Sequence, residues 1–132
     1  GELKAVKMIT SEGLSCEIAG LTRTMTKDID AAVDAGLNYI HTFIATSDIH
    51  LEHKLQMTRD QALEKAIEAV EYGKSRGLQV EFSAEDATRT DREFLKKIFG
   101  ERKYCIVKSL SPISHYILSF LTSATPSLSM CR

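Results

Sequence analysis

The sequence predicts an α/β fold in which parallel strands alternate with helices. Three observations support this prediction: helical and strand-like patterns alternate over residues 2–100, the strand-like runs are short and apolar, and two helical patterns open with a capping-box spacing. Parallel strands joined by helices require right-handed crossovers. A doubly wound sheet and a piece of a (β/α)8 barrel both satisfy this order. No GxGxxG or Walker-type loop is present, which disfavours a nucleotide-binding sheet.

The first three elements follow from hydrophobic spacing and from residues that favour helix ends. Residues 2–12 place apolar side chains at helical spacing, and residues 14–21, LSCEIAGL, predict a short strand. A helix is expected over residues 26–36. Thr26 is its expected N-cap, and Gly36 suits the left-handed position after its end.

The central part of the chain holds the clearest strand and the clearest helix. Residues 39–47, YIHTFIATS, are rich in β-branched and aromatic side chains, which favour a strand. A loop is expected over residues 48–57. Residues 58–77 predict a helix, because Thr58 and Gln61 form a capping box and apolar residues recur at intervals of three and four.

A third strand and a further helix complete the alternating pattern. Residues 78–85, LQVEFSAE, predict the strand because apolar and polar residues alternate along them. Residues 90–100 predict the helix, with Thr90 and Glu93 as its capping box. The serine-rich remainder, residues 101–132, holds both prolines and has no place in the α/β pattern.

Composition narrows the class of protein. The chain has 132 residues, 43% of them hydrophobic, and a formal net charge of −1, which gives no bulk field for nucleic acid or an anionic membrane. Its cysteines, Cys16, Cys105 and Cys131, form no CxxC pair, so reduced thiols are expected and Cys16 is interpreted as a small buried residue. No signal-peptide core and no apolar run of ~18 residues is present. These features predict a cytoplasmic protein.

The polar residues of the third strand are the first candidates for chemistry. Glu81, Ser83 and Glu85 alternate with apolar residues, so their side chains share one face. Ser83 and Glu85 lie at the carboxyl end of the strand, where parallel α/β folds place their sites, and a carboxylate there can act as a general base. The structural alternative is that Glu85 and Asp86 cap the following turn or pair with Arg89.

Three histidines offer weaker signals. His41 lies in an apolar strand, where a hydrogen-bonded core residue is the commoner outcome. His50 and His53 are three residues apart and could share a helical face. Without further ligands this pair does not predict a metal site.

Two long motifs carry a family resemblance. IHTFIATSDIHLEHKLQMT and VEFSAEDATRTDREFL closely resemble motifs of 2-isopropylmalate synthases, with EIAGLTR and DIDAAVDAG in register. The similarity runs from about residue 8 to residue 100. These enzymes belong to the acyl-CoA-dependent Claisen-condensing family, an acyltransferase family that also holds citramalate and homocitrate synthases. HTFIATS is more similar to the isopropylmalate synthases than to the citramalate synthases.

The resemblance implies a fold and a reaction. The fold would be a partial (β/α)8 TIM barrel, with the three strands as roughly the third to fifth of eight and flanking helices around them. Family members condense acetyl-CoA with a 2-oxo acid, here in leucine biosynthesis, and release CoA by hydrolysis of the thioester. A divalent metal (Mg²⁺, Mn²⁺ or Zn²⁺) polarises the 2-oxo carbonyl while a base takes a proton from the acetyl methyl group. The complete enzyme is expected to be a homodimer.

The resemblance also implies roles for individual residues. Glu85 and Ser83 match residues that face the reacting centre and are predicted to be catalytic. His41 and Ser83 are predicted to bind the substrate. Homocitrate synthases usually carry Arg at the position of Glu81, where it pairs with a second substrate carboxylate that Glu would repel. The expected 2-oxo acid is therefore 3-methyl-2-oxobutanoate, with citramalate synthesis from pyruvate or homocitrate synthesis as alternatives.

Departures from the family pattern limit what this chain is expected to do alone. The DTTLRDGEQ-type motif and the His-x-His pair of the metal site are absent, so the metal ligands are expected to be missing and the isolated chain inactive. We expect a partial barrel domain over residues 1–100 and a divergent tail, disordered or frameshifted, over residues 101–132. The alternative from another class is a non-catalytic α/β fragment that self-associates through open strand edges.

Overall fold

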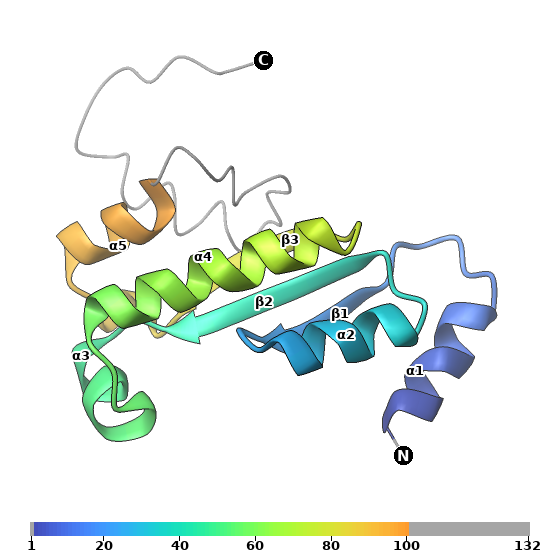
Figure 1. The fold of residues 1–132 in the computed structure, drawn as a ribbon, viewed down its shortest axis with the longest axis horizontal. Coiled ribbons are helices and arrows are strands. Elements are labelled where there is room, and N and C mark those ends of the chain that lie inside the picture. Colours follow the sequence, from blue (N-terminus) through green and yellow to red (C-terminus); the bar gives the residue numbers. More distant parts are fainter. Residues whose placement is uncertain (1, 101–132) are drawn as a thin grey trace, which may run out of the picture.

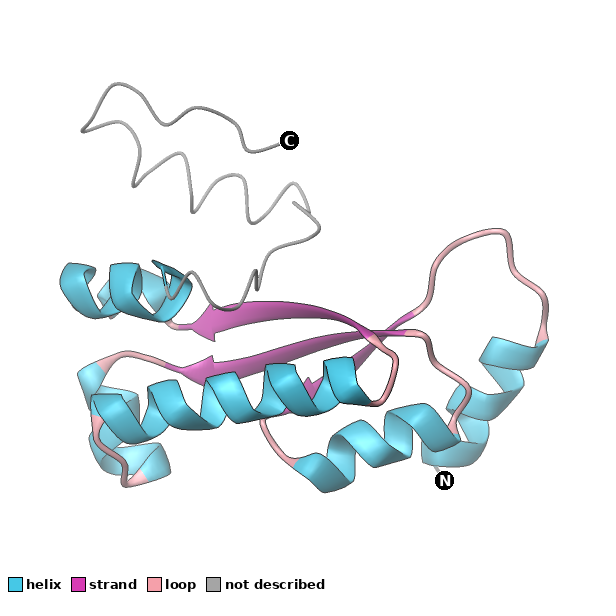
Figure 2. Cartoon of the chain, turned by 45° about the horizontal axis from the view of Figure 1, so that its top comes forward, coloured by secondary structure: helices cyan, strands magenta, loops and turns pink. Residues whose placement is uncertain are grey.

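A computed structural model describes residues 2–100 (Figures 1 and 2). The predictions for the tail, residues 101–132, therefore lie outside the described residues. In chain order the elements are α1 (Glu2–Ser11), β1 (Ala19–Arg23), α2 (Thr26–Asp34), β2 (Tyr39–Ala45), α3 (Asp48–His50), the π-helical turn η1 (Leu51–Leu55), α4 (Arg59–Ser75), β3 (Gln79–Glu85), the 3-10 turn η2 (Ala87–Arg89) and α5 (Arg92–Gly100).

The three strands form one parallel sheet in the order β1-β2-β3. Each neighbouring pair is joined through a helix, as the alternating pattern predicted. His41 at the middle of β2 has Leu21 of β1 and Glu81 of β3 as its register partners. Because register fixes which side chains share a face, His41, Leu21 and Glu81 all point to the same side of the sheet.

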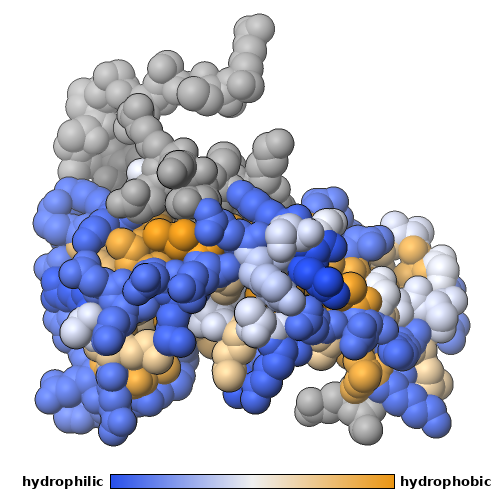
Figure 3. Space-filling model, in the orientation of Figure 1, coloured by the Kyte–Doolittle hydropathy of each residue, from blue (hydrophilic) through white to orange (hydrophobic). Residues whose placement is uncertain are grey.

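Helices α2 and α4 cover the other side of the sheet (Figure 2), and buried residues of α5 join the same apolar core. Ile40, Val80 and Phe82 pack there against the small residues of α4. Gly73 of α4 permits a close approach, because a Cβ at that position would lie 2.8 Å from Cγ2 of Val80 and 3.2 Å from Cδ1 of Ile40. On the face shown in Figure 3, polar side chains cover most of the surface and apolar ones are visible between them. The chemistry-bearing residues of the strands lie on the side away from this core.

Helix ends test the capping predictions. The Thr58–Gln61 box is confirmed, with both reciprocal hydrogen bonds formed at the start of α4. Thr26 is not an N-cap: it is the first helical residue of α2, and Met25 occupies the cap position without a side-chain bond. The predicted box at Thr90 is also wrong, because the amide of Phe94 donates to Oδ1 of Asp91 at 2.9 Å.

Three further expectations are corrected by the structure. The first strand begins at Ala19 rather than at residue 14, because its partner strand begins at Tyr39 and offers no ladder before that point. The expected loop over residues 48–57 contains α3 and η1, which Leu51 anchors in the core at 3% exposure. Cys16 is exposed, not buried, because it lies in the connection ahead of β1.

No helix within residues 2–100 combines the length and the apolar character needed to cross a bilayer.

Candidate functional site

Polar side chains of β2 and β3 are paired diagonally on the face that the helices leave uncovered. The hydroxyl of Tyr39 donates a hydrogen bond to Oε2 of Glu81. One step further along both strands, Nε2 of His41 and Oγ of Ser83 are 2.7 Å apart. Oε2 of Glu81 also lies 3.9 Å from Nδ1 of His41. The four side chains thus form a continuous row that ends at Ser83.

His41 and Ser83 share one hydrogen bond at the end of this row. Either side chain can donate it, depending on which ring nitrogen of the imidazole carries the proton. The His41 side chain is 33% exposed, so a small carbonyl or carboxylate compound can approach it.

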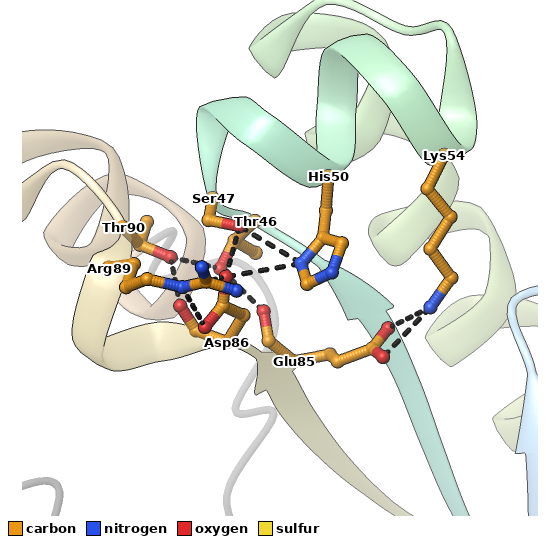
Figure 4. Close-up of polar contacts among 8 residues, drawn as sticks. All are labelled: Thr46, Ser47, His50, Lys54, Glu85, Asp86, Arg89 and Thr90. Atoms are coloured by element: carbon orange, nitrogen blue, oxygen red, sulfur yellow. Dashed lines mark hydrogen bonds and ion pairs between the residues drawn. The ribbon is translucent and has the colours of Figure 1, made fainter.

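Glu85 is the last residue of β3 and is held separately from that row. Its two carboxylate oxygens accept hydrogen bonds of 2.8 and 2.9 Å from Nζ of Lys54, which lies on η1 (Figure 4). Glu85 and Lys54 are both partly exposed, with side-chain exposures of 36% and 49%. A carboxylate at the carboxyl edge of the sheet can accept a proton from a bound reactant.

A hydrogen-bonded cluster follows Glu85 in the turn that ends β3. We call Ser47, His50, Asp86 and Arg89 the Asp86 cluster (Figure 4). Asp86 accepts hydrogen bonds from Nε of Arg89 at 2.8 and 2.9 Å and from the hydroxyl of Ser47 at 2.5 Å, and Nδ1 of His50 lies 3.1 Å from its Oδ2. The Arg89 guanidinium and then the Ser47 hydroxyl lower the pKa of the Asp86 carboxyl to about 2.

This lowered pKa predicts how the stability of the chain depends on pH. The pKa of Asp86 in the fold, about 2, lies below the ordinary value of about 3.9, so ionised Asp86 stabilises the fold fully above pH ~4 and that contribution disappears as the pH falls towards ~2. Asp86→Asn is expected to lower stability at neutral pH and to flatten the profile between pH ~4 and ~2. Urea unfolding followed by circular dichroism at a series of pH values measures both effects.

Asparagine is the informative replacement because it tolerates the left-handed backbone of Asp86, whose φ is 62°. Asp34→Asn, on the exposed side of α2, is the matched control for the loss of one surface carboxylate. Parallel profiles for the original chain and Asp86→Asn would contradict the assignment.

The structure brings some of the predicted site residues together and separates others. His41 and Ser83 are hydrogen-bonded to each other, whereas Glu85 contacts Lys54 instead. His50 turns to Asp86 while the His53 side chain is 71% exposed, so the two do not share a ligand site. The structural alternative was that Glu85 and Asp86 pair with Arg89. It is confirmed for Asp86 and wrong for Glu85, which pairs with Lys54.

Sequence reasoning missed Lys54 and Tyr39. A signal for Lys54 was present, since His50 and Lys54 are four residues apart and thus lie on one side of a helical segment. In the structure, the side chains on this side contact two consecutive carboxylates: His50 contacts Asp86, and Lys54 contacts Glu85. Nothing in the sequence distinguished Tyr39 from a core aromatic.

The described residues do not fit the divalent metal that the resemblance implies. Within residues 2–100 no group of three or more His, Cys, Asp or Glu side chains is arranged to hold a metal ion.

Comparison with known proteins gives a consistent result. The HMGL-like family model matches residues 1–108. A probable 2-isopropylmalate synthase of Methanopyrus kandleri is 58% identical over 99 residues, which cover 75% of this chain and 20% of that protein. Homocitrate synthase AksA of Methanothermobacter thermautotrophicus is 53% identical over 98 residues, which cover 74% and 25%. A putative (R)-citramalate synthase CimA of the same organism is 48% identical over 101 residues, which cover 76% and 20%.

The similarity expected from the two motifs is confirmed, and it spans three kinds of synthase. The chain covers between a fifth and a quarter of the length of each of these relatives. HMGL-like domains are TIM barrels, so the three parallel strands and their helices are a portion of a barrel wall.

Proposed function

The chain belongs to the HMGL-like family of acyl-CoA-dependent condensing synthases, and we propose that it supplies the 2-oxo acid pocket and a catalytic carboxylate of a 2-isopropylmalate synthase. The observation that carries the proposal is the hydrogen-bonded pair of His41 and Ser83 on the uncovered face, with Glu85 one alternating position beyond Ser83. In a closed barrel this face is the interior, and its carboxyl end is where the reaction takes place.

The proposed reaction assigns one task to each of these residues. The Glu85 carboxylate takes a proton from the methyl group of acetyl-CoA, and the resulting carbanion attacks the keto carbon of the 2-oxo acid. The C=O π bond opens as the new C–C bond forms, and the keto oxygen takes up a proton to become a hydroxyl group. His41 and Ser83 hydrogen-bond the 2-oxo acid and hold that carbon near Glu85. Hydrolysis of the thioester then releases CoA. The metal of the family would be held by residues other than those described, since residues 2–100 offer no ligand set.

Glu81 supports the choice of 3-methyl-2-oxobutanoate within the family. Its side chain is 13% exposed and lies on the same face as His41 and Ser83. A carboxylate fixed there repels a second carboxylate on the substrate, which disfavours 2-oxoglutarate. The proposed substrate is therefore a monocarboxylate 2-oxo acid, with pyruvate as the second candidate because it shares that charge.

Two chimeras test the proposal in complete barrels. In the first, the kandleri chimera, residues 2–100 replace the aligned segment of the Methanopyrus kandleri synthase. In the second, the AksA chimera, they replace the aligned segment of homocitrate synthase AksA. CoA release is then measured with 3-methyl-2-oxobutanoate, pyruvate and 2-oxoglutarate. Because the segment carries the pocket residues, both chimeras are expected to prefer 3-methyl-2-oxobutanoate to 2-oxoglutarate, by about tenfold or more in kcat/KM.

The two unmodified relatives are the controls for this experiment. An AksA chimera that keeps the substrate order of its parent would show that this segment does not select the 2-oxo acid. Turnover of pyruvate above that of 3-methyl-2-oxobutanoate in both chimeras would favour citramalate synthesis instead.

A further inference from the structure

The carboxylate of Glu85 is held from one direction by Lys54. Both hydrogen bonds that it receives within residues 2–100 come from Nζ of Lys54, and Figure 4 shows the carboxylate directed towards η1 and away from Asp86. Lys54 reaches this point because η1 follows β2, whose end lies beside the end of β3. A π-helical turn such as η1 is rare and is frequently found at functional sites.

Hydrogen bonds also hold the backbone at Glu85 and in the turn that follows it. The amide of Thr46 donates to the carbonyl oxygen of Glu85 at 3.1 Å, and the hydroxyl of Thr46 lies 2.6 Å from that of Thr90. Asp86 follows with φ 62° and ψ 36°, a left-handed conformation that is uncommon for residues other than glycine but accessible to Asp. The bonds of Ser47 and Arg89 to the Asp86 carboxylate stabilise this turn.

The Glu85 side chain is therefore less restricted than its backbone. The hydrogen bonds to its carboxylate that are found within the described residues come from Lys54 alone. A pair with this exposure contributes little to stability, since water and salt screen it. Its main effect is therefore on the orientation of the carboxylate.

We propose that Lys54 is a positioning residue that holds the Glu85 carboxylate in one orientation at the carboxyl end of β3. The role of that orientation in condensation rests on the proposed function. The orientation itself does not, so the two parts can be tested separately.

The first test uses the 132-residue chain and measures side-chain order. Three-bond couplings that report χ1 of Glu85 are recorded by NMR in the original chain and in Lys54→Met, which keeps the side-chain length but removes the charge. We expect one dominant rotamer in the original chain, rotamer averaging in Lys54→Met, and recovery of the single rotamer in Lys54→Arg. The control is Lys96→Met, which removes the Lys96–Glu93 pair of α5 and should leave Glu85 unchanged.

The second test uses the kandleri chimera and measures kinetics. Lys54→Met is expected to lower kcat about tenfold, the effect of losing a charged hydrogen bond. KM for 3-methyl-2-oxobutanoate is expected to change less than about twofold, because the proposed function assigns binding of the 2-oxo acid to His41 and Ser83. Lys54→Arg is expected to restore most of kcat.

The outcomes separate the two ideas. An equally ordered Glu85 in Lys54→Met, or averaging already present in the original chain, would overturn the positioning role and leave the proposed function standing. An unchanged kcat in Lys54→Met, in a chimera that does depend on Glu85, would overturn the link between orientation and reaction. A chimera whose kcat does not depend on Glu85 would contradict the proposed function, whatever the NMR result.

Discussion

Glu85→Gln in the kandleri chimera is expected to lower kcat by about 10²- to 10⁴-fold, the range that loss of a general base produces. Glutamine keeps the shape of the side chain, and its amide oxygen can still accept a hydrogen bond from Lys54. It cannot take a proton from the acetyl methyl group. KM for the 2-oxo acid is expected to stay close to that of the original chimera, because His41 and Ser83 are the residues proposed to hold that substrate. Steady-state CoA release with each substrate varied in turn provides the measurement.

Glu93→Gln is the control for Glu85→Gln. Glu93 lies on the exposed side of α5, where Lys96 is its partner, and it does not face the sheet. Its replacement should leave kcat unchanged. A Glu85→Gln chimera that retains more than about a tenth of the original kcat would assign the proton transfer to another group.

The second large effect is expected from a reversal of charge at Glu81. Glu81→Arg removes the carboxylate that is proposed to repel a dicarboxylate substrate and adds a guanidinium that can pair with one. One charged hydrogen bond stabilises by about 1.5–3 kcal/mol, so the preference for 2-oxoglutarate over 3-methyl-2-oxobutanoate is expected to rise about 10- to 100-fold. The ratio of the two kcat/KM values in the kandleri chimera measures this shift.

Glu81→Gln separates the effect of removing the negative charge from the effect of adding a positive one. It removes the negative charge without adding a positive one, so it should raise the relative use of 2-oxoglutarate less than Glu81→Arg does. Circular dichroism of both variants checks that the loss of the Tyr39–Glu81 bond does not unfold the sheet. An unchanged ratio in Glu81→Arg would place the distal end of the substrate away from this residue.

The sequence predicted the two faces of β3 correctly because alternation is a local property. Val80 and Phe82 are buried against the helices, while Glu81 and Ser83 point to the other side, as their spacing required. The Thr58–Gln61 box was equally predictable, since both partners lie within one helical turn.

Other features depend on neighbours that are distant in the sequence. Thr90 resembles a helix cap, but its hydroxyl bonds Thr46 across the ends of two strands, and Asp91 provides the cap instead. The pairing of Lys54 with Glu85 depends on the parallel register of β2 and β3, which brings η1 beside the end of β3. No local pattern in either segment contains that information.

The three side-chain pairs on the uncovered face of β2 and β3 and at its carboxyl edge are all made within one short part of the chain. Both partners of every pair lie between residues 39 and 85. The hydrogen-bonded pairs are Tyr39 with Glu81, His41 with Ser83, and Lys54 with Glu85. A single recombination event between two related genes could therefore transfer the whole set together, with no contact divided between parents. In a family whose members differ in the acid they consume, such an exchange offers a direct evolutionary route from one specificity to another.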